Sequence, residues 1–302
     1  MFGDDLMERV ILHCDCNCFF ASVEAALDPS LNKYAFAVCG DPEMRHGIIL
    51  AKNEAAKKFG VKTGEAIWQA KAKCPRLVLV APHYSCYKDF SSRIFSVYSQ
   101  YTELVEPFGI DEAWLDVTGS VKLFGSGFEI AEKLRERIKN EIGVSISVGV
   151  SFNKTFAKMG SDYKKPDATT VITKENFREL LYPLPAGDFF MVGRSTAKKL
   201  FNVGIKTVGD IAEADEDFIC RLLGENGEKL LQTIYGYDYS PVKPFGFREP
   251  YKSIGNGLTF KRDLVNPSEV RTCVFYLCDK VAARLRKHNK ECTAVQVGIK
   301  DT

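Results

Sequence analysis

Two adjacent carboxylates, Asp111 and Glu112, follow a Pro-Phe-Gly turn and precede an apolar run with the character of a strand. Neighbouring side chains on an ideal strand point to opposite faces, so an acidic pair here is not simply one solvated face. At a strand end or hairpin tip, however, both carboxylates can turn toward one cation. Mg²⁺ binds one or two carboxylates together with substrate phosphates. The pair is therefore either a solvated turn or part of a magnesium site.

A third carboxylate, Asp15, lies about a hundred residues upstream, in the apolar segment 9–24 that starts as a strand and continues as a helix. A lone carboxylate in an apolar run is costly unless it is paired or bound to a cation. Alternation places Asp15 on one strand face with His13 and Asn17. The opposite face carries three cysteines, Cys14, Cys16 and Cys18. These lie about 6.5–7 Å apart along a strand, too far for sulfurs that share a zinc ion, and are predicted to face the core.

The composition is that of a soluble protein with several domains. The 302 residues fit about two to four compact units, and 45% hydrophobic content supports real cores. No secretory signal and no apolar run of membrane-spanning length occurs, which predicts a cytoplasmic protein with no membrane partner. The ten cysteines show no C-x-x-C or Cys/His zinc spacing, and reduced thiols are expected. Residues 251–302 hold ten Lys/Arg against five Asp/Glu, compatible with nucleic acid or with a solvated helix.

The elements around the carboxylates alternate between strands and helices. Helices are predicted at 84–105, 127–142 and 151–158, and strands at the start of 9–24, at 106–116 (a hairpin), at 144–150 and at 169–173. The resulting strand-helix-strand-strand-helix-strand order predicts a ferredoxin-like α+β sheet. Residues 32–82, with predicted strands at 35–40 and 47–52, form a small lobe inserted between Asp15 and Asp111.

The remaining chain divides into a helical segment, a linker and a basic end. Residues 188–235 are predicted to be all helical, with Gly193 at a tight turn where backbone N–H groups make an anion site. An element of this kind is either a helix-hairpin-helix that grips DNA phosphate or an ordinary pair of packed helices. After a proline-rich linker, strands are predicted at 251–261 and 293–299 around a helix at 267–290. This β-α-β fragment predicts only part of a domain.

Together these residues resemble the Y-family (translesion) DNA polymerases. Four separated motifs carry the resemblance in family order: residues 15–24, 109–116, 145–158 with 165–166, and the hairpin around Gly193. The resemblance implies an α+β multidomain protein with a ferredoxin-like palm, small fingers, an all-helical thumb with a helix-hairpin-helix, and a partial α+β little finger. The implied boundaries are 1–22 and 85–172 for the palm, 23–84 for the fingers, 173–236 for the thumb, 237–250 for the linker and 251–302 for the N-terminal part of the little finger.

The implied activity is template-directed DNA synthesis of the error-prone translesion type, in DNA damage tolerance and repair. A DNA-directed DNA polymerase of this family adds dNTPs to a primer 3′-OH on template-primer DNA by two-metal-ion nucleotidyl transfer. By resemblance, Asp15, Asp111 and Glu112 would hold two Mg²⁺ ions, with the main-chain carbonyl of Cys16. One ion would lower the pKa of the 3′-OH and the other would neutralise the triphosphate and the leaving pyrophosphate. Any sliding-clamp peptide would lie beyond Thr302.

The resemblance also implies contacts with the nucleotide and with DNA. Phe20 falls on the family's steric gate, a ring that abuts the sugar C2′ of the incoming nucleotide. Cys18 and Phe19 would offer backbone N–H groups to the triphosphate, and Lys165 matches the family's phosphate lysine. The residues expected to grip DNA are Gly193, Arg194 and Lys198.

One fingers motif departs from the family pattern. Many relatives carry a tyrosine and an arginine that contact the triphosphate, whereas this chain has Glu54 and Lys57 there. Lys57 keeps the charge of arginine without its bidentate fork, and Glu54 would repel phosphate. Lys57 remains the candidate nucleotide contact from the fingers.

Two other functions stay open from the residues. A palm-fold nucleotidyl cyclase would share the sheet and the carboxylates, but such enzymes carry a Gly-Gly-Asp-Glu-Phe type of hairpin and have no use for a DNA-gripping element. A catalytically impaired DNA-binding relative would not need the intact acid trio. Magnesium-dependent primer extension separates all three.

Overall fold

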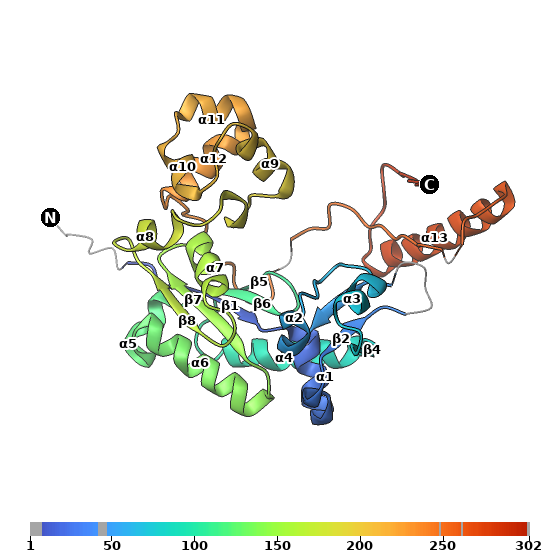
Figure 1. Ribbon diagram of the computed structural model, residues 1–302, viewed down its shortest axis with the longest axis horizontal. Coiled ribbons are helices and arrows are strands. Elements are labelled where there is room, and N and C mark those ends of the chain that lie inside the picture. Colours follow the sequence, from blue (N-terminus) through green and yellow to red (C-terminus); the bar gives the residue numbers. More distant parts are fainter. Residues whose placement is uncertain (1–7, 42–46, 248, 261, 301–302) are drawn as a thin grey trace.

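A five-stranded sheet forms the centre of the computed structural model, which describes residues 8–41, 47–247, 249–260 and 262–300 (Figure 1). Its strand order is β5 (Val105–Pro107), β6 (Glu112–Asp116), β1 (Ile11–Cys16), β7 (Ile146–Ser151) and β8 (Thr169–Ile172). Neighbours are antiparallel except β7 and β8, which are parallel. With α4 (Tyr84–Tyr98) before β5 and α6 (Gly127–Ile142) before β7, the predicted ferredoxin-like order is confirmed.

The two faces of the sheet have different chemistry. On one face, β1 places Cys14 and Cys16 in the main core with apolar residues of α4 and α6. This confirms that both cysteines face the core, and burial raises the pKa of the Cys14 thiol. The other face is covered by α7 (Lys154–Tyr163) and receives His13 and Asp15.

A glycine pair allows α7 to approach the sheet closely. A Cβ on Gly149 of β7 would lie 1.9 Å from the carbonyl oxygen of Ala157, and one on Gly160 would lie 2.9 Å from the Gly149 Cα. Such distances leave room for hydrogen atoms only. Because Gly149 pairs with His13 across the sheet, this contact brings α7 down beside the polar part of β1.

The lobe inserted between β1 and α4 has a sheet and a core of its own. Its strand order is β3 (Ile49–Lys52), β2 (Phe36–Cys39) and β4 (Val78–Val80), with α2 (Glu54–Lys58) and α3 (Ile67–Lys73) alongside. The chain enters this lobe through α1 (Phe19–Leu27), which starts directly after β1.

A separate helical unit follows β8 and α8 (Phe177–Leu181). It contains α9 (Arg194–Asn202), α10 (Val208–Glu213), α11 (Glu216–Leu223) and α12 (Glu225–Ile234), packed around a core that also includes Phe156 and Met159 of α7. Figure 1 shows the unit on the side of the sheet that α7 covers. The predicted all-helical segment is confirmed, and among the described parts of the chain no helix is long and apolar enough to cross a membrane.

The predicted linker has no helix or strand in its described residues, yet it is attached to the sheet domain. Asp238 accepts hydrogen bonds from the backbone N and the hydroxyl of Thr155 at 3.1 and 3.0 Å. Further along, the Lys243 backbone N donates to Glu106 at 3.0 Å. The segment is therefore a strap across the sheet domain and not a free tether.

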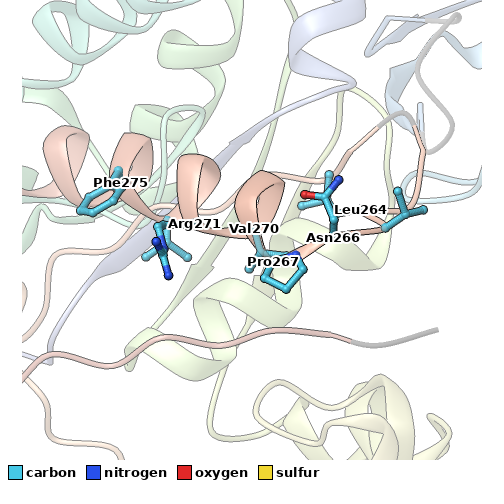
Figure 2. A pocket seen from close by; sticks show the side chains of 8 residues that line it. Leu264, Asn266, Pro267, Val270, Arg271 and Phe275 are labelled. Carbon is cyan, nitrogen blue, oxygen red and sulfur yellow. The ribbon is translucent and has the colours of Figure 1, made fainter.

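The C-terminal region corrects one prediction. The helix is present as α13 (Pro267–Lys287), but the described residues of 251–261 and 293–299 form no strand. A strand needs a neighbour to take its backbone hydrogen bonds, and these segments pair with none; Val295, for example, is 79% exposed. No residue of α13 is buried. A hollow of about 590 Å³ runs along its first turns, lined by Leu264, Val265, Asn266, Pro267, Val270, Arg271, Val274 and Phe275 (Figure 2).

Candidate active site

The three predicted carboxylates meet at one end of the central strand pair. Asp15 and Glu112 are direct cross-strand partners in the β1–β6 ladder. Asp111 precedes β6 in the hairpin, where its carbonyl accepts a hydrogen bond from the Cys16 backbone N at 3.0 Å. The β1–β6 register therefore joins acids from two distant motifs, as the sequence predicted.

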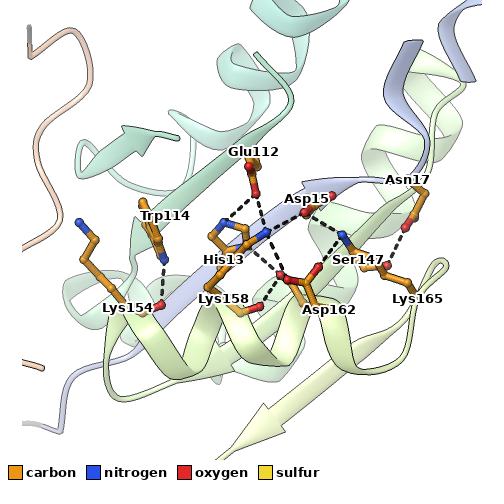
Figure 3. A network of polar contacts seen from close by, with 11 residues as sticks. His13, Asp15, Asn17, Glu112, Trp114, Ser147, Lys154, Lys158, Asp162 and Lys165 are labelled. Carbon is orange, nitrogen blue, oxygen red and sulfur yellow. Dashed lines mark hydrogen bonds and ion pairs between the residues drawn. The ribbon is translucent and has the colours of Figure 1, made fainter. Parts of the chain in front are cut away.

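Two lysines from the α7 region neutralise part of this acidic charge (Figure 3). The Lys158 ammonium lies 2.6 Å from Glu112 Oε2 and 3.0 Å from Asp15 Oδ2, and the Lys165 ammonium lies 2.8 Å from Asp15 Oδ2. Asp162 contacts both lysines, at 3.4 Å from Lys158 and 2.8 Å from Lys165. All but Asp162 are less than a third exposed, so these contacts are weakly screened by solvent.

The pKa shifts follow from burial and from these charges. Burial raises the pKa of Asp111 and of Glu112, and the Asp15 charge raises both further. Burial acts in the same direction on Asp15, but Lys165 and Lys158 outweigh it and lower the pKa of Asp15. For Lys158, burial opposes the charged form, yet Asp15 and Glu112 raise its pKa. The site therefore favours additional positive charge near Asp111 and Glu112.

A buried histidine completes the group. His13 Nδ1 lies 2.8 Å from the Ser161 hydroxyl oxygen, and that hydroxyl donates to the Lys158 carbonyl at 2.8 Å. Since the serine proton is engaged, Nδ1 carries the imidazole hydrogen, a tautomer assigned from this network. His13 Nε2 then presents a lone pair 3.4 Å from Glu112 Oε2, and it is a buried atom without a hydrogen bond in the described part of the chain. Burial and the Lys158 charge lower the pKa of His13 and keep the ring neutral.

These residues fit a divalent cation. One ligand atom each from His13, Asp15 and Glu112 lies within 4.8 Å of the others, and the carboxylate oxygens suit a hard ion. The bare Nε2 lone pair and the raised pKa of Glu112 both call for positive charge there, whereas Asp111 is not one of these three residues. Asn17, predicted on the same face, uses its amide in two other hydrogen bonds. Its oxygen accepts from the Ser147 hydroxyl at 2.9 Å, and its nitrogen donates to the Ser145 hydroxyl at 3.1 Å.

The segment after β1 turns sharply away from the acids. Cys18 is left-handed, with φ of 50°, and caps α1, so Phe19 and Phe20 begin a helix directly beside the acid site. Phe19 is buried in the main core, and Phe20 is half-buried with its ring stacked on Tyr87 at 4.2 Å.

Residues of the inserted lobe also reach this turn. The Cys18 thiol lies 3.5 Å from Glu54 Oε1, and Lys57 forms a 3.5 Å ion pair with the same oxygen. Both partners are about half exposed, so the pair contributes little stability. Lys57 is thus close to the start of α1 and is not locked in place.

The predicted DNA-gripping residues lie elsewhere. Gly193 caps the start of α9 in an extended conformation, and Gly193, Arg194 and Lys198 are all exposed on the helical unit. No hydrogen bond or ion pair joins these three residues to the acids in the described part of the chain, and their contact with DNA stays a prediction.

Three residues of the site were not assigned a role from the sequence. Lys158 ended a motif that was recognised as a whole, and Asp162 follows it at the helical i,i+4 spacing. His13 was placed on the correct face by strand alternation alone. The i,i+4 spacing could have suggested Asp162. The hydrogen-bond partner of His13 lies in a helix about 150 residues later, so no local sequence pattern indicates it.

Comparison with known proteins agrees with the geometry. Residues 14–162 match the model of the impB/mucB/samB family, and residues 251–302 match the C-terminal domain model of that family. DNA polymerase IV of Acetivibrio thermocellus is 52% identical over 98% of this chain and 74% of its own length. DNA polymerase IV 1 of Bacillus subtilis is 38% identical over 96% of this chain and 69% of its own.

Solved structures give the same result. The Y-family DNA polymerase chimera Dbh-Dpo4(243-245)-Dbh superposes with a TM-score of 0.81 at 27% identity, covering 91% of this chain and 80% of that one. The insertion ternary complex of Dbh DNA polymerase has a TM-score of 0.72 at 29% identity, covering 77% and 69%. The nucleotidyl cyclase alternative is thereby set aside. The four motifs, the β1–β6 acid pair and these relatives agree that the chain belongs to the Y-family of DNA polymerases, as a DNA-directed DNA polymerase of the translesion type.

Proposed function

We propose that Asp15, Asp111 and Glu112 hold two Mg²⁺ ions and that this trio carries the addition of dNTPs to a primer 3′-OH. The observation that supports it best is the direct pairing of Asp15 with Glu112, whose ligand atoms lie within 4.8 Å of each other and of one on His13. When bound, such ions lower the pKa of an attacking hydroxyl and stabilise charge on a triphosphate. The Cys16 main-chain carbonyl, next to Asp15, is the further oxygen ligand.

The residues around the trio would bind and orient the nucleotide. The Lys165 ammonium, 2.8 Å from Asp15 and 27% exposed, stands where it can reach a triphosphate held at the acids. The backbone N–H groups of Cys18 and Phe19 open the nine-residue α1, and free N–H groups at a helix start favour phosphate. Lys57 can leave its weak surface pair with Glu54 for the same phosphates.

Phe20 is proposed as the steric gate against the sugar C2′. It follows Asp15 closely, it is half-buried, and its ring offers an apolar face with no hydrogen-bonding atom to accommodate a hydroxyl. A clash rejects an added hydroxyl more effectively than a lost hydrogen bond does.

The rest of the chain would hold template-primer DNA. The exposed Gly193, Arg194 and Lys198 at the start of α9 suit phosphate contacts without base recognition. We assign the palm to 1–22 and 85–172, the fingers to 23–84, the thumb to 173–236, the linker to 237–250 and the little finger to 251–302. The proposed setting is cytoplasmic.

Primer extension in Mg²⁺ tests the acid trio. Asp111→Ala and Glu112→Ala should each reduce nucleotide addition by orders of magnitude while DNA binding persists, because a metal ligand is lost without a core residue being lost. Glu106→Ala is the matched control. Glu106 lies in β5, the strand next to β6, and its carboxylate contacts Lys154 of α7 at 2.7 Å. Near-normal extension by either trio variant would refute the assignment.

A further inference from the structure

A second aromatic ring stands directly behind Phe20. The Tyr87 ring stacks on it with centroids 4.2 Å apart and planes inclined by only 12°. Tyr87 is fully buried, whereas Tyr84, which contacts the edge of Phe20 at 6.0 Å, is 53% exposed. One face of Phe20 therefore rests against a ring that is itself surrounded by protein.

Tyr87 is fixed at its other end by a buried carboxylate. Its hydroxyl donates a hydrogen bond to Glu24 Oε1, and Glu24 is only 3% exposed. His83, at the start of α4, places Nδ1 3.0 Å from both oxygens of the same carboxylate. A buried carboxylate with two partners has little freedom to move, and so holds the phenol in one position.

The helical spacing explains why one tyrosine serves both contacts. Phe20 and Glu24 are four residues apart on α1 and share one face of that helix, while His83 and Tyr87 are four apart at the start of α4. The α1 face thus presents a ring and a carboxylate to a single residue of α4.

We propose that Tyr87, held by Glu24, is a positioning residue that sets the sugar discrimination of Phe20. The inference rests on the proposed gate and extends it. A steric gate excludes a hydroxyl only if its ring cannot move aside. A phenylalanine ring with nothing packed behind it can change rotamer. With Tyr87 behind it, the Phe20 ring has no space on that side. Glu24 and His83 do not touch the nucleotide in this proposal; they act through Tyr87.

The test is the ratio of kcat/KM for a dNTP to that for the matching rNTP on one template. Tyr87→Leu removes the ring behind the gate and should lower this preference by about tenfold or more, mainly by improving the rNTP. Tyr87→Phe keeps the ring behind the gate but loses the hydroxyl that Glu24 holds, and should lower the preference by about threefold. Glu24→Gln keeps the shape of the side chain but weakens the hold on the phenol, and should lower the preference by about threefold.

Tyr98→Leu is the matched control. Tyr98 is also fully buried in α4, but among the described rings it contacts Phe95 and not Phe20. It should reduce thermal stability as Tyr87→Leu does while leaving the dNTP-to-rNTP ratio unchanged, because a loss of folded enzyme lowers both rates alike. A relaxed ratio in Tyr98→Leu would overturn the inference, since general loosening would then explain Tyr87.

Phe20→Ala separates the inference from the gate itself. If Phe20→Ala leaves the ratio unchanged, the proposed gate fails and Tyr87 has nothing to position. If Phe20→Ala relaxes the ratio and Tyr87→Leu does not, only the role of Tyr87 is refuted. In the double variant, Tyr87→Leu should add no further relaxation, because its effect passes through Phe20. Should Tyr87→Leu fail to fold, an unchanged ratio in Glu24→Gln refutes the inference.

Discussion

Replacing Lys158 by methionine should make the stability of the protein depend on divalent cations. Lys158 is the one Lys or Arg that the described part of the chain places within ion-pair distance of Glu112, and it also contacts Asp15. Methionine keeps most of the apolar stem but removes the charge. The acids would then face each other with Lys165 alone, which contacts Asp15 and not Glu112.

The size of the effect follows from burial. The Lys158 side chain is 12% exposed and its partners 12% and 20%, so the contacts count as largely buried. Removing one partner of such a cluster costs about 3 kcal/mol, the low end of the range for fully buried pairs. For a cooperatively unfolding unit of about 150–250 residues, that loss corresponds to a fall of about 6–12 °C in Tm. A divalent cation at a concentration of about a hundred times its Kd stabilises the folded protein by about 2.7 kcal/mol, so it should restore most of the lost stability.

The measurement is thermal unfolding of the DNA-free protein in EDTA and in excess Mg²⁺ or Mn²⁺. The native chain should respond less to the metal than Lys158→Met, because a bound ion must first displace the ammonium. Lys154→Met is the matched control: Lys154 lies one turn earlier in α7, is also 12% exposed and pairs with Glu106 at 2.7 Å. An equal metal response in native, Lys154→Met and Lys158→Met proteins would refute the reasoning.

Three further outcomes are expected. In a salt series, the logarithm of the association constant for duplex DNA should fall linearly with the logarithm of the salt concentration. Arg194→Ala should make that slope shallower by about one unit without changing the sequence preference. Asp238→Asn should lower Tm near neutral pH: burial would raise the pKa of Asp238, but hydrogen bonds from Ser240 and the α7 start lower it. A carboxyl whose pKa is lower in the folded protein stabilises the fold at pH values above its unfolded pKa of about 3.9. That stabilisation is lost as the pH falls through the folded pKa. The difference in Tm between the native protein and Asp238→Asn should therefore vanish in acid. Gly149→Ala should cost about 3 kcal/mol in denaturant unfolding, whereas Gly119→Ala, whose Cβ would meet nothing within 4 Å, should be near neutral.

Local patterns in the sequence were sufficient for the strand that carries Asp15. Alternation separated the cysteine face from the Asp15 face because one side of the sheet packs on α4 and α6 and the other on α7, which supplies Lys158 to Asp15. The hairpin at Asp111 and Glu112 followed from its turn residues, and the β1–β6 ladder then joined it to Asp15. The alternation and the turn each depend on residues close in sequence, whereas the ladder joins segments about a hundred residues apart.

Contacts between distant segments were beyond such patterns. The strap at Asp238 looked like a loose linker because proline-rich composition does not show that Thr155 would bind it. The predicted strands at 251–261 and 293–299 have strand-like residues, but a strand forms only where a partner exists. The helix α4 ends at Tyr98, earlier than the predicted 105, because the chain must turn there to enter β5.

The pairing of Asp15 with Glu112 also has a consequence for how the chain folds. About a hundred residues separate the two strands, and the whole inserted lobe lies within that loop. Closing a loop twice as long costs only about 0.6 kcal/mol more, so the insertion weakens the final ladder very little. Non-local strand pairing is nevertheless slow to form, whereas the lobe, with a core of its own, can condense on its own contacts. During refolding, the acid site should therefore be among the last parts of the molecule to assemble, and affinity for divalent cations should appear after most of the helical signal has returned.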